Sequence, residues 1–186
     1  MRVLGISGSL RRGSLNSALL RAAAERLPAG AELVEFDRLR DIPPYDEDVD
    51  AEATPAAVEE LRETVRSADA VLIATPEYNH SIPGQLKNAL DWVSRPAGKS
   101  ALNGKPAAVI GASTGMFGAV WAQAELRKVL SAMGGRVVEV ELPVGHAKDQ
   151  LVGDRLELIP QQSEQLEEIL AELVAQAEIE AGLVAA

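Results

Sequence analysis

Short apolar runs alternate with amphipathic segments along most of this chain of 186 residues. The run AVLIA at 70–74 is apolar at every position, which is typical of a strand buried on both faces of a parallel sheet. The expected strands are residues 2–6, 31–36, 70–74, 106–111 and 137–142. The expected helices are residues 16–27, 55–66, 84–93, 119–133 and 161–180. The alternation predicts an α/β protein with helices on both faces of a parallel sheet.

A single domain is expected over residues 1–186, because no repeat or low-complexity linker divides the chain. The acidic segment 37–54 and the segment 143–160 are both expected to be irregular loops. Thr54 is expected to cap the helix that follows it.

Composition excludes several kinds of chemistry. The net charge of −10 argues against nucleic acid or an anionic membrane as the main partner. There is no cysteine, so redox chemistry here would need a bound cofactor. Two histidines, His80 and His146, are too few for a histidine-rich metal centre, and no metal site is expected. No signal-peptide pattern and no membrane-spanning apolar run is found, so we expect a cytoplasmic protein.

The loops after the first, third and fourth strands are the candidate site, because ligands of such sheets bind beyond the carboxyl ends of the strands. The first loop, SGSLRRGSLN, offers the hydroxyls of Ser9 and Ser14, the amide of Asn16 and the guanidinium of Arg11. It leads into a helix N-terminus, which favours anions. A turn with a helix cap would explain Ser14 or Asn16, but not Arg11. The loop therefore predicts a site for a phosphate monoester.

A dinucleotide-binding fingerprint is the main competitor for this loop. Gly5, Gly8 and Gly13 do not have the G-x-G-x-x-G spacing, although Glu35 or Asp37 could serve as the acid on a ribose. A phosphate-binding P-loop does not fit either, because no Lys-Ser/Thr pair follows the glycines.

The loop after the third strand, TPEYNHSIPG, is bounded by Pro76 and Pro83, which stiffen both ends. Its hydrogen-bonding groups suit the edge of a flat heterocycle, although each residue taken singly fits packing, a turn or the surface. His80 is expected to support the site or lie on the surface rather than act as a catalytic base.

The loop after the fourth strand is again built from small residues, Ser113, Thr114 and Gly115 among them. Met116 and Phe117 follow, and either could cover an apolar ring or fill a subunit contact. Core packing explains Phe117 equally well.

The segments GSLRRGSLN, TPEYNHSIPGQLKNALDWVSRP and GASTGMFGAVWAQAELRKVL, with DIPPYDEDVD, resemble the NAD(P)H-dependent FMN reductases of flavodoxin-like fold. That family includes bacterial quinone and chromate reductases, and the likeness runs from Arg2 to the last helix. It implies a three-layer fold with a five-stranded parallel sheet in the order 2-1-3-4-5. It also implies one FMN per subunit, NADPH or NADH as electron donor, and a homodimer or homotetramer with FMN near the subunit contact.

The resemblance also implies a set of cofactor-binding residues. The residues that would hold the phosphate are Ser9, Arg11, Ser14, Leu15 and Asn16. Those that would line the isoalloxazine are Pro76, Glu77, Tyr78 and Asn79. Those that would complete the pocket are Ser113, Thr114 and Gly115. Backbone donors at Tyr78 and Asn79 would stabilise charge on the reduced flavin. Trp92 and Trp121 are candidates for the subunit contact or for the core. The resemblance also implies a second small residue at the position where this chain has Met116.

The implied reaction is a ping-pong transfer of two electrons from NAD(P)H, through FMN, to a small acceptor such as a quinone, chromate, an azo compound or a flavin. No catalytic acid or base is assigned, because the cofactor does the bond-making. Two alternatives stay open: a flavodoxin-type electron carrier that does not oxidise NAD(P)H, and an α/β binding module without flavin.

Overall fold

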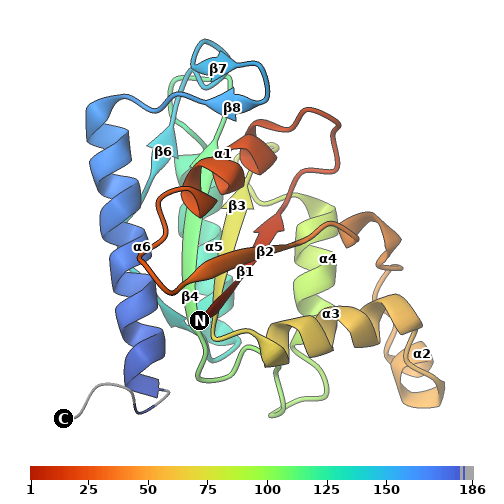
Figure 1. Cartoon of the computed structure of the whole chain (residues 1–186). Helices are drawn as coiled ribbons and strands as arrows, with labels where there is room; N and C mark the ends of the chain where they lie inside the picture. The colour runs from red at the N-terminus through yellow and green to blue at the C-terminus, as the bar shows by residue number, and fades with distance from the viewer. Residues whose placement is uncertain (181, 183–186) are drawn as a thin grey trace.

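The computed structural model describes residues 1–180 and 182. A parallel sheet in the order β2-β1-β3-β4-β5 forms its middle layer (Figure 1). The strands are β1 (Arg2–Ser7), β2 (Glu32–Phe36), β3 (Ala70–Thr75), β4 (Pro106–Ala112) and β5 (Arg136–Val137). A further short strand, β6 (Pro143–Val144), pairs with β4, and β7 (Leu151–Val152) forms a separate hairpin with β8 (Arg155–Leu156). The expected α/β fold and strand order are confirmed.

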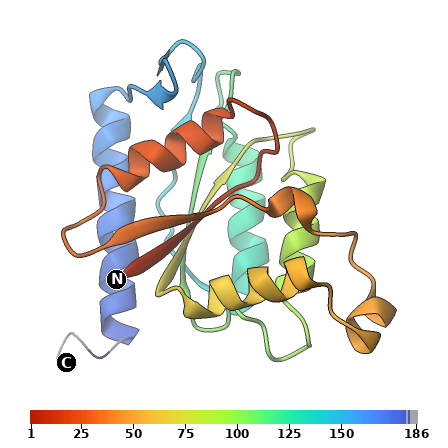
Figure 2. The ribbon, with the colours of Figure 1, turned by 45° about the vertical axis from the view of Figure 1, so that its right-hand side comes forward.

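Helices cover both faces of the sheet, as Figure 2 shows. On one face, α1 (Leu15–Ala24) and α6 (Pro160–Glu180) pack against the strands around an apolar cluster that includes Leu19 and Leu170. On the other face, a second cluster that includes Leu61 and Leu126 joins the sheet to α3 (Ala56–Ser67), α4 (Gly84–Val93) and α5 (Val120–Ala132). The sheet is therefore buried on both sides.

Burial on both faces explains the apolar runs of the central strands. Every residue of β3 and of β4 is buried. The helices need only one apolar face each, and α3 buries Val58, Leu61 and Val65 at helical spacing. Burial of such apolar side chains is the main favourable contribution to folding.

The register of the sheet brings the ends of three strands level with one another. Ser7 at the end of β1 lies opposite Ala74 of β3, and Thr75 at the end of β3 lies opposite Gly111 of β4. The loops that follow β1, β3 and β4 therefore start side by side at one edge of the sheet.

The expected fifth strand at 137–142 is interrupted. Only Arg136–Val137 and Pro143–Val144 pair with β4, and residues 138–142 between them form no strand. The buried side chain of Gln123 accounts for the end of this break. The Gln123 Oε1 accepts a hydrogen bond from the backbone N–H of Leu142 at 3.2 Å. Gln123 also donates to the carbonyl of Gly118 at 3.0 Å.

The segment 37–54 was expected to be a loop, and this is wrong in part. It contains a 3₁₀ turn at Leu39–Asp41 and the short helix α2 (Glu47–Glu52). Asp46 caps α2 by accepting from the N–H of Asp48. The expectation that Thr54 caps the next helix is also wrong, because its hydroxyl donates to Asp50 and the N-cap of α3 is Pro55 without a side-chain bond.

This segment is fixed to α3 and α4 by buried polar contacts. Arg62 of α3, with only 4% of its side chain exposed, pairs with Asp50 at 2.8 Å and donates to the carbonyl of Trp92. The Trp92 indole N–H donates to the carbonyl of Pro43 at 2.8 Å. Trp92 is fully buried, so this candidate for the subunit contact belongs to the core.

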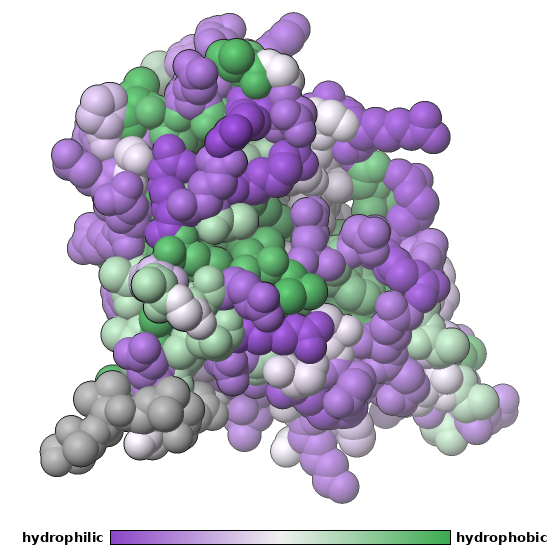
Figure 3. Space-filling view, in the orientation of Figure 1, coloured by the Kyte–Doolittle hydropathy of each residue, from purple (hydrophilic) through white to green (hydrophobic). Residues whose placement is uncertain are grey.

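The surface seen in Figure 3 is mostly hydrophilic, with hydrophobic colour gathered near the middle of that face. Among residues 1–180 and 182, none of the helices combines the length and the apolar character needed to cross a membrane.

Candidate functional site

A cavity of about 430 Å³ lies at the carboxyl ends of β1, β3 and β4. Its lining comes from all three strand-end loops and from one later segment: Ser9, Arg11, Gly13, Ser14, Leu15, Asn16, Pro76, Glu77, Tyr78, Ala112, Ser113, Thr114, Lys148 and Leu151. Every residue that the sequence predicted for the site lines it except Asn79 and Gly115. The fold thus brings segments that are about a hundred residues apart in sequence together around one cavity.

Two other cavities, of about 530 and 560 Å³, are larger, but they lie elsewhere. One is formed around the ends of α4 and α5, and the other between α2, α3 and residues 95–97. Neither is lined by the loops that follow β1, β3 and β4, so the smaller cavity is the better candidate.

The first part of the cavity is the turn before α1. The buried Ser14 is the N-cap, and its Oγ accepts from the N–H of Asn16 at 3.1 Å and of Ser17 at 3.3 Å. Its hydroxyl hydrogen is therefore free for an acceptor in the cavity. The N–H of Leu15 and the guanidinium of the exposed Arg11 have no acceptor in the described part of the chain. This end favours an anion.

The side chain of Asn16 has a structural role, unlike those of Arg11 and Ser14. Its side chain is buried, its Nδ2 donates to the carbonyl of Ala112 at 3.0 Å, and its Oδ1 accepts from the N–H of Ala112 at 3.0 Å. The amide thus ties the start of α1 to the end of β4. Its position beside the cavity holds the two loops together, and these two bonds use one N–H and one oxygen lone pair of the amide.

The loop after β3 forms a tight two-residue hairpin. Tyr78 and Ser81 exchange both backbone hydrogen bonds, at 3.0 and 3.2 Å, and Asn79 and His80 between them have φ angles of 54° and 61°. Positive φ at both central positions defines a type I′ turn, in which Asn is favoured at the first. The Tyr78 N–H is therefore taken by Ser81 and is not the free donor that the sequence suggested. Asn79 is exposed at the tip, outside the cavity lining.

Glu77 connects this loop to α5. Its carboxylate accepts from the N–H groups of Trp121 and Ala122 in the first turn of α5, at 3.1 and 3.2 Å. A carboxylate at a helix N-terminus is stabilised by the helix dipole. Glu77 thus fixes the loop to the start of the helix that follows β4.

The loop after β4 is held by the segment 143–147. Ser113 donates its N–H to Val144, and Ala147 donates its N–H back to the carbonyl of Ser113, both at 3.0 Å. The backbones approach so closely that a Cβ at Gly118 would collide with Pro143. The backbone hydrogen bonds and the close approach of the two segments together fix Ser113 and Thr114 at the cavity.

Lys148 and Leu151 line the cavity but were not expected from the sequence. They come from the segment 143–160, for which the sequence predicts only an irregular loop. The available signal was weak: Gly145 with a lysine shortly after it, next to the last strand.

Glu35 and Asp37, the acids considered for a ribose, lie outside this cavity. They line a smaller one of about 240 Å³ that shares Ser9 and Arg11 with it. Burial raises the pKa of Glu35, while the nearby Arg21 opposes that rise.

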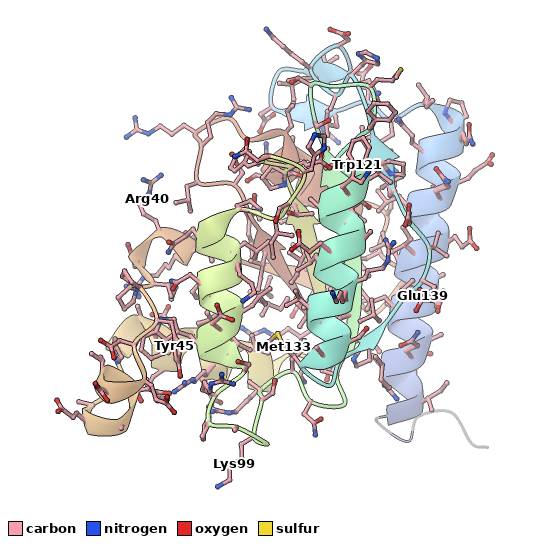
Figure 4. The ribbon with its side chains drawn as sticks, turned by 180° about the vertical axis from the view of Figure 1, so that it is seen from behind. Arg40, Tyr45, Lys99, Trp121, Met133 and Glu139 are labelled. Carbon is pink, nitrogen blue, oxygen red and sulfur yellow. The ribbon has the colours of Figure 1, made fainter. Side chains whose placement is uncertain are left out.

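Large apolar side chains stand exposed next to the cavity. Tyr78 of the lining, Met116, Phe117 and Trp121 are each between 42% and 65% exposed. The Trp121 ring meets those of Phe117 and His80 edge to face, with 4.9 Å between centroids in both cases. Figure 4 shows Trp121 at the end of α5 that faces the strand-end loops. We call Met116, Phe117 and Trp121 the aromatic patch.

The two ends of the cavity differ in chemistry. One end has a cation, a hydroxyl and a helix N-terminus; the other has Pro76 and the rigid hairpin at Tyr78. This donor set suits a ligand with a phosphate at one end and a flat ring at the other.

Comparison with known proteins decides the family. A family model for NADPH-dependent FMN reductases matches residues 1–149. The chain belongs to this family of oxidoreductases. It is 54% identical over 130 residues to an NAD(P)H-dependent FMN reductase of Pseudomonas aeruginosa, covering 70% of this chain and 69% of that protein. It is 42% identical over 139 residues to a quinone reductase of Escherichia coli K12, covering 74% and 73%.

A solved structure extends the likeness to nearly the whole chain. FerB, a flavoenzyme NAD(P)H:(acceptor) oxidoreductase of Paracoccus denitrificans, matches with a TM-score of 0.82 and 34% identity, covering 96% of this chain and 97% of FerB. This likeness supports the flavodoxin-like fold that the sequence indicated.

Proposed function

We propose that the protein binds one FMN per subunit and passes two electrons from NADPH or NADH to a small acceptor. The observation that carries the proposal is the cavity at the ends of β1, β3 and β4, which joins an anion-favouring turn to a rigid hairpin. The family membership gives the reaction class.

The cavity offers separate places for the two halves of FMN. Arg11, the Ser14 hydroxyl and the N-terminus of α1 would hold the phosphate. Pro76 and Tyr78 would lie against the ring, and the Asn79 N–H, which has no acceptor within the described residues, would donate to its edge. When bound, FMN accepts a hydride and returns two electrons.

We propose a ping-pong order because the donor and the acceptor need the same open side of the cavity in turn. A quinone, chromate, an azo compound or a free flavin could each fill the acceptor role. The chain's own part is positional: the hairpin at Tyr78 and the Ser113 loop hold the two walls at fixed separation. No side chain is assigned as a proton donor, and His80, which is mostly exposed, is left outside the reaction.

We also propose that the protein works as a homodimer or homotetramer in the cytoplasm. The aromatic patch supports the assembly, because large apolar side chains side by side on a surface are characteristic of protein contacts. Of the two tryptophans considered for such a contact, only Trp121 is exposed.

Anaerobic half-reactions test the proposed reaction. Addition of NADPH or NADH to the FMN-loaded protein should bleach the flavin absorption, and a quinone added afterwards should restore it. Initial rates at several donor and acceptor concentrations should give parallel double-reciprocal lines. A loaded protein whose colour persists with either nucleotide, yet bleaches with dithionite, would be an electron carrier of flavodoxin type.

A further inference from the structure

Lys148 places a second positive charge in the flavin cavity. It lines the cavity together with Arg11, although the two residues are 137 positions apart in the chain. Its ammonium group has no hydrogen-bond or ion-pair partner within residues 1–180 and 182. An exposed, unpaired cation at the lining of a cavity, in a protein with a net charge of −10, is available to an anionic ligand.

The backbone next to Lys148 is fixed relative to the cavity. Ala147 donates its N–H to Ser113, and His146 donates its N–H to Gly115, both at 3.0 Å. The Gln150 side chain donates to the carbonyl of Gly145 at 3.1 Å. Because Ser113 itself lines the cavity, Lys148 extends from a base whose position is set by the wall of the site.

The charges on the cavity are net positive. Arg11 and Lys148 face it, with Glu77 as the opposing acid in the lining. The Glu77 carboxylate already accepts from two N–H groups at the start of α5, so part of its charge is compensated there. A phosphate monoester carries about 1.5 to 2 negative charges near pH 7, which one arginine and a helix N-terminus balance only in part.

The segment after Lys148 connects the cavity to α1, the helix whose N-terminus offers N–H groups to an anion. Leu151, which also lines the cavity, begins the β7–β8 hairpin, and a 2.6 Å hydrogen bond from Arg21 in the last turn of α1 to the carbonyl of Asp154 ties this hairpin to the helix. Figures 1 and 2 show the hairpin and the start of α1 at the same end of the molecule. The anion-favouring Ser14 and Leu15 belong to that start.

We propose that Lys148 is a second cationic ligand of the flavin phosphate, acting with Arg11. The inference rests on the proposed function, because it concerns the same cavity and the same cofactor. It adds a charged residue from the segment 143–160, which also contributes Leu151 to the cavity lining.

The test compares two flavins that differ only in the phosphate. Apoprotein is titrated with FMN and with riboflavin, and quenching of flavin fluorescence gives each dissociation constant. Lys148→Met, which keeps the length and removes the charge, should weaken FMN binding about tenfold, the loss expected of one charge-assisted contact, and leave riboflavin binding unchanged. Lys148→Arg should bind FMN within about threefold of the native protein.

Lys99→Met is the matched control, because Lys99 lies at the far end of the molecule in Figure 4. It should change neither dissociation constant. Added salt should weaken FMN binding more steeply in the native protein than in Lys148→Met, since the variant has one charge fewer to screen.

Three results would overturn the proposal. FMN affinity could be unchanged in Lys148→Met, riboflavin affinity could fall as much as FMN affinity, or Lys99→Met could lose as much as Lys148→Met. Failure of the native protein to bind either flavin would instead contradict the proposed function itself.

Discussion

Arg11 is the residue on which the proposed phosphate site most depends. It lines the cavity from an exposed turn, beside the buried N-cap Ser14. We expect Arg11→Ala to weaken FMN binding by roughly 1.5–3 kcal/mol, the range for a hydrogen bond to a charged group. Activity lost on dilution should return when excess FMN is added. The measurement is the FMN dissociation constant of the apoprotein.

The neighbouring Arg12→Ala is the control for this prediction. Arg12 is also exposed, but it lines the smaller cavity near Glu35 and not the main one. Its replacement should leave FMN affinity within about threefold of the native value. Equal losses in the two variants would mean that only the overall charge of the turn matters.

Asn16 gives a prediction about folding rather than about ligand binding. Its amide satisfies both backbone groups of the buried Ala112. Asn16→Ala should lower the free energy of unfolding of the apoprotein by about 1–3 kcal/mol, the range for leaving a buried polar group unsatisfied. Urea unfolding without flavin measures this. If the apoprotein kept its stability and only FMN affinity fell, Asn16 would be a phosphate ligand after all.

At the level of elements, the segment that contains α2 depends on the buried pair of Asp50 and Arg62. Arg62 also donates to the Trp92 carbonyl and lies 3.7 Å from the exposed carboxylate of Glu59, so loss of Asp50 leaves its buried guanidinium only partly compensated. Asp50→Asn should destabilise the protein by about 1–3 kcal/mol near pH 7. The exposed pair of Lys87 and Asp91 is the control, and Asp91→Asn should cost less than about 1 kcal/mol.

The same pair predicts a dependence on pH. The hydrogen bond from Arg62 lowers the pKa of Asp50 in the folded protein. A lowered pKa stabilises the fold at pH values above the unfolded pKa of about 3.9, and this stabilisation is lost as the pH falls through the folded pKa. The stability difference between the native protein and Asp50→Asn should therefore be constant from neutral pH to about pH 5 and shrink below about pH 4. A difference that stays constant to lower pH would contradict the assignment.

The helices and strands were predictable from sequence because the spacing of their apolar residues follows which side chains are buried. Strands such as β3 are apolar at every position because both faces are covered, and the helices show one apolar stripe each. The predicted ends of the strands were enough to predict most of the residues that line the cavity, since the carboxyl ends of parallel strands meet at one edge of the sheet.

Contacts between irregular segments were not predictable. Lys148 reaches the cavity through backbone bonds to the Ser113 loop, and such bonds leave no pattern of residue types. The break after β5 depends on one buried side chain, Gln123, whose target is 19 residues away. The Tyr78 N–H is taken by a turn that only the φ angles of Asn79 and His80 reveal.

On the scale of the whole molecule, the aromatic patch predicts self-association. We expect the native protein to sediment as a dimer or tetramer. Phe117→Asp should shift it toward the monomer, because a charge in the middle of an apolar contact is desolvated without a partner. Ile159→Asp is the control, since Ile159 is 50% exposed directly before α6 and is not part of the patch. A native monomer, or dissociation by both variants, would contradict the prediction.

The proposed function as a whole requires that three strand-end loops bind FMN in one cavity. The most direct measurement is a titration of purified apoprotein with FMN, followed by desalting and a melting curve. The account predicts saturable binding of one FMN per subunit, a yellow protein after desalting, and a melting temperature raised in the native protein more than in Arg11→Ala. A protein that stays colourless with an unchanged melting temperature would contradict it.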